Sequence, residues 1–257
     1  MRRDSFTFLL AFLSIILSII LFFPVINLLA TTSISQYIGA FLDTEVRLAI
    51  FLSLFTATLT TVLAIILGVP LAYILARKDF PFRNVIDSLV DLPILIPHTV
   101  AGIALLTLFG PRALIGSTLR NIGLVFTSTI YGIILAQFFV SAPLLIKTTK
   151  EVLLKIDENI IKVARTLGAS SREVFFDIEL PLSARGILTG AILCWARAIS
   201  EFGAVIILAY YPHTAPVLIY IRFETWGLSA SKPISALLLL VTLLIFILLK
   251  YIEKKGE

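Results

Sequence analysis

The chain has 257 residues, of which 59% are hydrophobic and only 14% are charged. Soluble globular domains carry about 25% charged residues, so this composition excludes a soluble domain and predicts a protein that crosses the membrane several times. The net charge of +5 is expected from the retention of Lys and Arg on the cytoplasmic side of a membrane. It does not indicate nucleic-acid binding.

Six apolar runs are long enough to cross a bilayer, whose hydrocarbon core of about 30 Å takes roughly 20 helical residues. The first run exceeds the apolar stretch of about 7 to 15 residues found in a secretory signal, so we expect a retained helix there, with a cleaved signal as the alternative. The chain has no Gly/Ser linker and no clear internal repeat, so one domain over residues 1–257 is the simplest count. The predicted fold class is an all-α membrane protein with six transmembrane helices, near residues 6–29, 47–76, 85–109, 123–147, 184–210 and 233–252.

The distribution of Lys and Arg predicts the orientation of the six helices. An even number of spans puts both termini on one side of the membrane. Fifteen Lys and Arg fall on that side, in the N-terminus, residues 77–83, residues 147–185 and the C-terminus, whereas five fall on the other. Because these residues are retained in the cytoplasm, we expect both termini and the segment between spans four and five to be cytoplasmic.

The third run is interrupted by two prolines. Pro93 and Pro97 stand four residues apart, and His98 and Thr99 follow at once. Proline removes donors from the helical hydrogen-bond ladder, and the freed carbonyl groups need partners other than lipid. We therefore expect this span to face protein or a water-filled cavity and to line a pathway. His98 has no second His or carboxylate at ligand spacing, which favours an interior or boundary histidine over a metal ligand.

Two carboxylates precede these prolines. Asp87 and Asp91 stand four residues apart at the start of the third run. We interpret them as marking the cytoplasmic entry of the helix, with a place on the pathway as the alternative.

The segment 157–181, DENIIKVARTLGASSREVFFDIELP, is the most polar long stretch of the chain. Asp157 can cap a helix whose apolar residues follow three-and-four spacing, and Gly168 suits the left-handed residue that ends it. A charged, amphipathic segment between two spanning helices usually faces something in the water. We expect a docking surface, with an amphipathic helix lying in the lipid headgroups as the alternative.

A second helix is predicted in the same segment. Ser170 and Glu173 form a capping box, in which each side chain accepts the backbone N–H of the other residue. Pro181 cannot continue that helix and biases Leu180 toward an extended backbone. The prediction is therefore two short helices joined by a glycine turn.

The fifth run contains two opposite charges four residues apart. An unpaired charge at membrane depth costs at least about 2.5 kcal/mol, so Arg197 and Glu201 should pair or face a wet interior. Two interpretations stay open. One is a pathway or gating element that includes Phe202 and Gly203, and the other is a structural ion pair that locks helices together.

No motif for catalysis or cofactor binding occurs in the sequence. The chain lacks a G-x-x-x-x-G-K-[ST] phosphate loop, an H-E-x-x-H zinc helix and a G-x-S-x-G nucleophile turn. Cys194 is the single cysteine, so neither an intrachain disulfide nor a thiolate metal cluster can form. We therefore predict no catalytic residue, no metal and no cofactor. Energy from ATP would have to come from a partner docked on the polar segment.

The polar segment resembles the cytoplasmic signature of ABC importer permeases, written E-A-A, three residues, G, nine residues, I, one residue, L-P. The spacing agrees at every step, but Lys162 stands where the family has Glu, and Val163 where it has Ala. Contacts made by the family's acid therefore do not transfer to this chain. The resemblance implies that the residues coupling the chain to an ATPase are Ile160, Lys162, Val163, Ala164, Arg165, Gly168, Ala169, Ile178, Leu180 and Pro181.

Two further stretches resemble permeases for tetrahedral oxyanions. ARAISEFGAV in the fifth run is similar to their ARALGEFGA-type stretch, and LPILIPHTVAGIALLTLFG is similar to their proline-rich third span. The stretch from Leu108 through PRALIG is most similar to the molybdate and tungstate branch. Sulfate or thiosulfate is the alternative substrate.

The resemblance also implies partners and a mechanism. Two permease copies would form the pathway as a homodimer in the cell membrane, with two ABC ATPase subunits on the cytoplasmic side and an external substrate-binding protein. ATP would drive alternating access, and this chain would itself be no enzyme. A second hypothesis is an ion-driven carrier that uses Asp91, Arg197 and Glu201 as a charge relay. A third hypothesis, a membrane enzyme, is not supported, because the sequence shows no cluster of catalytic residues.

Overall fold

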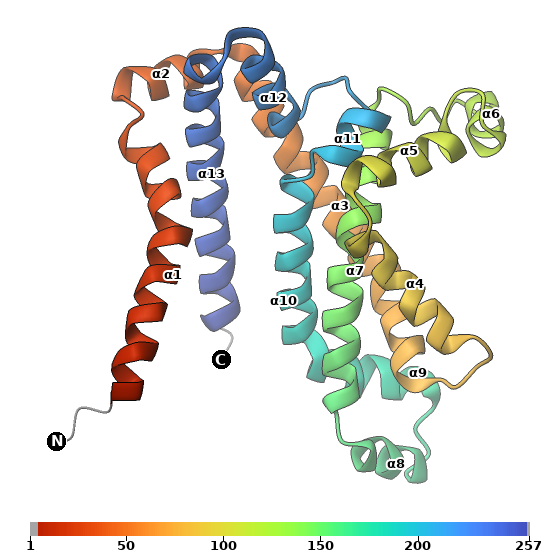
Figure 1. Ribbon diagram of the computed structural model, residues 1–257. Helices are drawn as coiled ribbons and strands as arrows, with labels where there is room; N and C mark the ends of the chain where they lie inside the picture. The colour runs from red at the N-terminus through yellow and green to blue at the C-terminus, as the bar shows by residue number, and fades with distance from the viewer. Residues whose placement is uncertain (1–4, 256–257) are drawn as a thin grey trace.

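The computed structural model describes residues 5–255, and all regular structure within them is helical (Figure 1). The predicted all-α class is confirmed for this part of the chain. In chain order the elements are α1 (Ser5–Ala30), α2 (Ile34–Leu42), α3 (Thr44–Arg77), α4 (Arg83–Leu95), α5 (His98–Phe109), α6 (Leu114–Asn121), α7 (Ile130–Lys155), α8 (Glu158–Thr166), α9 (Ser171–Glu173), the π-helix η1 (Val174–Glu179), α10 (Leu180–Ile199), α11 (Gly203–Leu208), α12 (Ala215–Trp226) and α13 (Leu228–Lys255).

Six segments of the described chain are long and apolar enough to cross a membrane. Five are single helices, namely α1, α3, α7, the continuous helix Ser171–Ile199 and α13. The sixth is the pair α4 and α5, which is bent by 115° at the break between the two helices. Five of the six predicted spans are therefore present as single helices, and the predicted third span is a bent pair that breaks at Pro97.

Two spans differ from their predicted ranges. α7 begins at Ile130, seven residues after the predicted start, because the Thr129 side chain accepts the Gly132 amide and caps the helix there. A turn at Gly123, with φ of 83°, precedes it. The predicted fifth span reaches residue 210, whereas α10 ends at Ile199 and the short helix α11 follows a break. The apolar composition of both segments predicted a span there, but it did not show at which residue the helical hydrogen bonds begin or end.

Helices α3, α7 and α10 form the packed centre of the molecule. A Cβ on Gly186 of α10 would lie 2.7 Å from Val152 Cβ of α7, and one on Gly190 would lie 3.2 Å from Leu145 Cα. Small residues of this kind let two helices approach closely. The two glycines therefore set how near α10 lies to α7.

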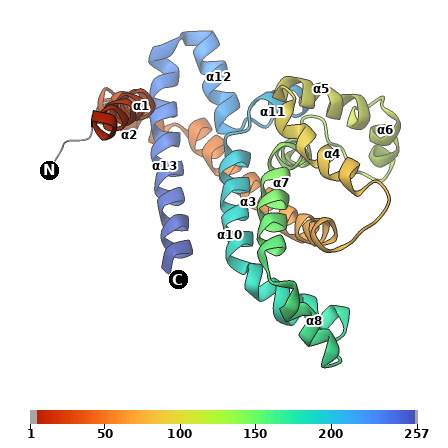
Figure 2. The ribbon, with the colours of Figure 1, turned by 60° about the horizontal axis from the view of Figure 1, so that its bottom comes forward.

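α1 and α13 stand to one side of this centre (Figures 1 and 2). In the most apolar stretch of α1 no residue is buried within the described structure. The lower ends of α1 and α13 and the whole of α8 lie at the same end of the bundle (Figure 1), as an even number of spans requires. Arg2 and Arg3, which add to the positive charge of that end in the sequence, lie outside the described residues.

Candidate functional site

The first helix of the polar segment, α8, is capped at both ends as its sequence predicts. The Asp157 carboxylate accepts a backbone N–H of the first turn at 2.9 Å. At the other end Gly168 has φ of 92°, its amide donates to Arg165 O, and the Ala169 amide donates to Ala164 O, both at 3.0 Å. These two bonds make a Schellman motif, for which glycine supplies the left-handed residue. The glycine turn fixes the direction in which the chain leaves α8.

The second predicted helix does not end at Pro181. The Ser170 amide donates to the Glu173 carboxylate at 2.7 Å in the expected capping box, but the helix then continues through η1 into α10. Leu180 is helical, with φ −64° and ψ −46°, and its amide donates to Phe175 O, five residues back. Pro181 directly follows these π-turns, and the change from π to α bonding at this point is where the continuous helix accommodates the proline. The expectations of two short helices and of an extended Leu180 are therefore wrong.

α8 has an apolar face that the described chain leaves uncovered. Ile160, Val163 and Leu167 are 45%, 59% and 83% exposed, and α8 has no buried residue within the described structure. Their spacing of three and four puts them on one side of the helix. α8 also projects past the ends of α7 and α10 (Figure 1). Such a stripe is typical of a surface that binds a protein partner or lipid headgroups.

The predicted coupling residues divide between this helix and the base of the segment. On α8 and its glycine turn lie Ile160, Lys162, Val163, Ala164, Arg165, Gly168 and Ala169. In η1 and the first turn of α10 lie Ile178, Leu180 and Pro181. The structure thus brings the first group together on one projecting helix and places the second where the segment rejoins the membrane helices.

Lys162, which replaces the family's acid, has only a weak partner among the described residues. Its Nζ lies 3.4 Å from the Glu158 carboxylate, and the two side chains are 69% and 70% exposed. An exposed pair of this kind contributes about 0 to 1 kcal/mol. Lys78 and Arg165 line the same groove between α3 and α8. Glu158 and Glu179 line it as well, so the groove presents both signs of charge.

The second candidate site lies where two spans break. α5 begins directly after Pro97, and α11 begins at Gly203. The two breaks face each other, because a Cβ on Gly203 would lie 2.6 Å from His98 Cβ and 3.3 Å from Thr99 N. Only glycine permits this approach of the two backbones. The predicted pathway residues of the third and fifth spans therefore meet.

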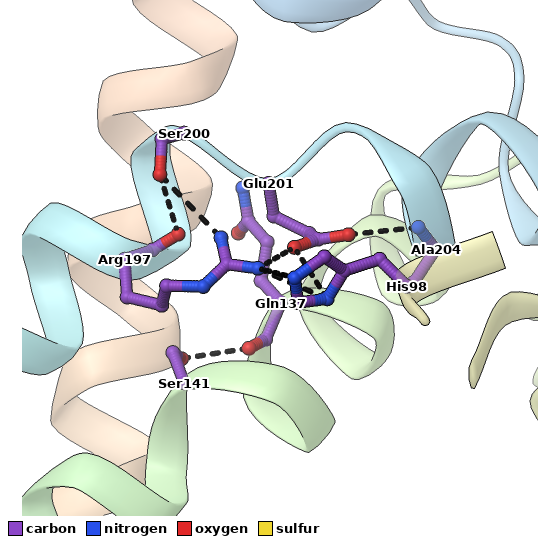
Figure 3. A network of polar contacts seen from close by, with 7 residues as sticks. All are labelled: His98, Gln137, Ser141, Arg197, Ser200, Glu201 and Ala204. Carbon is purple, nitrogen blue, oxygen red and sulfur yellow. Dashed lines mark hydrogen bonds and ion pairs between the residues drawn. The ribbon is translucent and has the colours of Figure 1, made fainter. Parts of the chain in front are cut away.

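A buried carboxylate organises this junction (Figure 3). Glu201 is 1% exposed, and it accepts Arg197 Nη2 at 2.6 Å and the Ala204 backbone N–H at 2.7 Å. The two ring nitrogens of His98 lie 2.8 and 3.0 Å from the same Arg197 Nη2. The predicted Arg197–Glu201 pair is confirmed. His98 joins it, which sequence spacing could not show because the two segments are 99 residues apart.

The exposed polar side chains of this junction would cost free energy if they faced lipid. The Arg197 and His98 side chains are 25% and 42% exposed, and polar groups at membrane depth face protein or a water-filled cavity. Phe202 packs beside the junction against Tyr220, with ring centroids 5.0 Å apart. Pro93 is buried inside α4. Within residues 5–255 no group of three His, Cys, Asp or Glu side chains could hold a metal ion.

α7 makes polar contacts that the spacing of residues in the sequence does not reveal. Lys150 Nζ lies 2.6 Å from Asp87 Oδ1, and Lys147 Nζ lies 2.9 Å from Asp91 Oδ1. These two ion pairs hold α4 against α7. The fully buried Gln137 of α7 accepts the Thr60 hydroxyl at 3.2 Å, which links α7 to α3. None of these partners could be found from local spacing.

Residues 64–256 match the family described as the binding-protein-dependent transport system inner membrane component. The chain therefore belongs to this family, the membrane-spanning permeases of ABC transporters. It is a multi-pass membrane protein and a transport component.

Two individual relatives are permeases for tetrahedral oxyanions. The chain is 42% identical over 254 residues to the molybdate/tungstate transport system permease protein WtpB of Thermococcus kodakarensis, with 98% of each chain covered. It is 33% identical over 193 residues to a probable sulfate transport system permease protein of Chlorokybus atmophyticus, with 74% of this chain and 68% of that one covered.

A solved structure shares the fold. It is a bacterial alginate ABC transporter in complex with an alginate pentasaccharide-bound periplasmic protein, with a TM-score of 0.79 and 19% identity over 99% of this chain and 96% of that one. At this identity the likeness shows the fold alone.

We predict that the double variant Arg197→Glu, Glu201→Arg, in which the two charges are exchanged, does not fold. The arginine at position 201 would oppose the Ala204 N–H, which is itself a donor. Glu201→Gln is the matched variant, because its amide oxygen can still accept that N–H, and we expect intermediate stability from it. The measurement is the yield of monodisperse protein on size exclusion after solubilisation. A wild-type yield from the exchanged variant would show that the two charges need only each other.

Proposed function

We propose that this chain is the permease subunit of an ATP-driven importer for molybdate and tungstate. Its membership of the ABC permease family and its full-length similarity to WtpB support this substrate class. The sulfate permease is less similar and aligns over less of the chain. The main observation in favour of coupling to an ATPase subunit is the uncovered apolar face of α8. Because the sequence has no nucleotide-binding motif, ATP hydrolysis belongs to a separate subunit.

The ATPase subunit docks on α8, at the cytoplasmic end of the bundle. α8 is only nine residues long and projects beyond the ends of α7 and α10 (Figure 1). Its exposed polar residues carry both signs of charge, whereas helices that lie on membranes are rich in Lys and Arg. Both features favour a protein partner. Two ATPase subunits serve two permease copies, and both termini lie on the same cytoplasmic side.

The pathway lies between two copies of this chain. A closed twofold dimer is the commonest symmetric assembly, and the family resemblance implies two permease copies. The junction of His98, Arg197 and Glu201 lies at the end of α10 opposite α8, where the two spans break. Broken helices at membrane depth are tolerated where they line a cavity, and they form substrate sites in many carriers. This junction therefore gates the pathway, and an external binding protein delivers the anion at that end.

We predict that Gly168→Val leaves the protein inserted in the membrane but separates ATP hydrolysis from uptake. Gly168 has φ of 92° with nothing within 4 Å of a Cβ, so valine would strain the backbone by about 1 to 3 kcal/mol without a clash and would misdirect α8. Gly123→Val is the matched control, because Gly123 has φ of 83°, equal free space and a place outside the polar segment. The measurement is ATPase rate and anion uptake in proteoliposomes. Coupled uptake by Gly168→Val would count against a lever role for α8.

We predict that external binding protein loaded with molybdate or tungstate stimulates the ATPase of the reconstituted complex, and that sulfate-loaded binding protein does so weakly. The measurement is phosphate release with each anion in turn and with empty binding protein as the control. Strong stimulation by sulfate alone would reassign the substrate. Anion uptake by this chain alone on an ion gradient, without ATP, would favour the ion-driven carrier and reject the importer.

A further inference from the structure

One arginine closes the base of the polar segment. Arg77, the last residue of α3, donates through Nε to Glu179 Oε1 at 2.6 Å. Its Nη2 donates to Leu153 O at 2.6 Å and lies 3.5 Å from Ile156 O. Leu153 lies in the last turn of α7 and Ile156 is its C-cap residue, where the chain enters the segment. Glu179 ends η1, where the chain leaves it. A single guanidinium therefore contacts the chain on both sides of the segment.

These contacts are strong because of where they lie. The Glu179 side chain is 1% exposed and that of Arg77 is 11% exposed. A buried ion pair is costly to break from one side, since the remaining charge keeps its desolvation penalty. The last carbonyl groups of a helix lack partners within the helix and carry partial negative charge. Arg77 satisfies such a carbonyl of α7 through Nη2 and the carboxylate through Nε. The planar guanidinium holds these two nitrogens at a fixed spacing, whereas a lysine carries all its donors on one nitrogen.

The same carboxylate connects the segment to α10. Glu179 directly precedes the first residue of α10, and η1 continues into that helix without a break. At its other end α10 is followed by Glu201, which binds Arg197 and lies beside His98 of α5. α10 therefore runs from the Arg77 contact to the junction of the two broken spans.

We propose that Arg77 is a positioning residue for energy coupling. It holds the entry and the exit of the polar segment to the end of α3, so that a displacement of α8 moves α3, α7 and α10 as one unit instead of bending the segment at its base. This inference rests on the proposed function, because it requires an ATPase subunit that displaces α8.

The test uses the complete reconstituted transporter with Arg77→Lys and Glu179→Gln. Arg77→Lys keeps the charge and loses the fork, whereas Glu179→Gln keeps an acceptor oxygen and loses the charge. The measured quantity is the number of ATP molecules hydrolysed per anion imported. We expect both variants to raise this ratio at least about fivefold, the lower end of typical coupling between two sites, with ATPase activity retained. Arg83→Lys is the matched control, since Arg83 donates to Leu75 O and Asp79 outside the segment.

A purely structural role would lower the melting temperature and the active fraction without changing ATP hydrolysed per anion. An unchanged ratio in active Arg77→Lys and Glu179→Gln transporters would therefore overturn the proposal. If neither variant assembles, Arg77 acts in folding, and the positioning role is likewise rejected. The ratio is measured with whichever anion the wild-type complex imports. A wild-type complex that imports none with ATP would instead refute the proposed function.

Discussion

Two buried carboxylates, one at each end of α10, determine how the rest of the structure is arranged. Glu179 precedes the helix and Glu201 follows it, and both are 1% exposed. A carboxylate in such surroundings needs a cation and hydrogen-bond donors, because its desolvation costs several kcal/mol. Arg77 supplies the cation at one end and Arg197 at the other. α10 is thereby held to α3 and α7 beside the polar segment, and at its other end Arg197 contacts His98, the first residue of α5.

The two functional regions are separated along this helix. The uncovered face of α8 lies at the end of the bundle where α1 begins and α13 ends (Figure 1), and the junction of the broken spans lies near the opposite end of α10. Close packing through Gly186 and Gly190 joins α10 to α7 along its length. A well-packed interface of this kind transmits a shift instead of absorbing it. Under the proposed function, such a helix is a direct physical route from the ATPase subunit on α8 to the junction of the broken spans.

Local features of this fold could be predicted from the sequence, and contacts between distant segments could not. Capping residues and a glycine with positive φ specify α8 through bonds within a few residues, so its boundaries were predictable. Pro181 does not end the helix because the turns directly before it are the π-turns of η1, which the proline itself does not reveal. The partners of Arg77 and His98 lie 76 to 102 residues away in sequence. No periodicity connects such residues, so the pairing appears only once the helices are assembled.

The central claim is that the apolar face of α8 binds the ATPase subunit, and cysteine labelling tests it most directly. Cys194, the native cysteine, is buried, so Val163→Cys in lipid nanodiscs can be modified selectively with a water-soluble maleimide, with Ser117→Cys on exposed α6 as the control. We predict fast modification at position 163 in the permease alone and at least about tenfold slower modification once the ATPase subunits bind, with no change at position 117. Equal rates at position 163 with and without ATPase would contradict the claim. Protection by the bilayer alone would show that α8 lies in the headgroups instead.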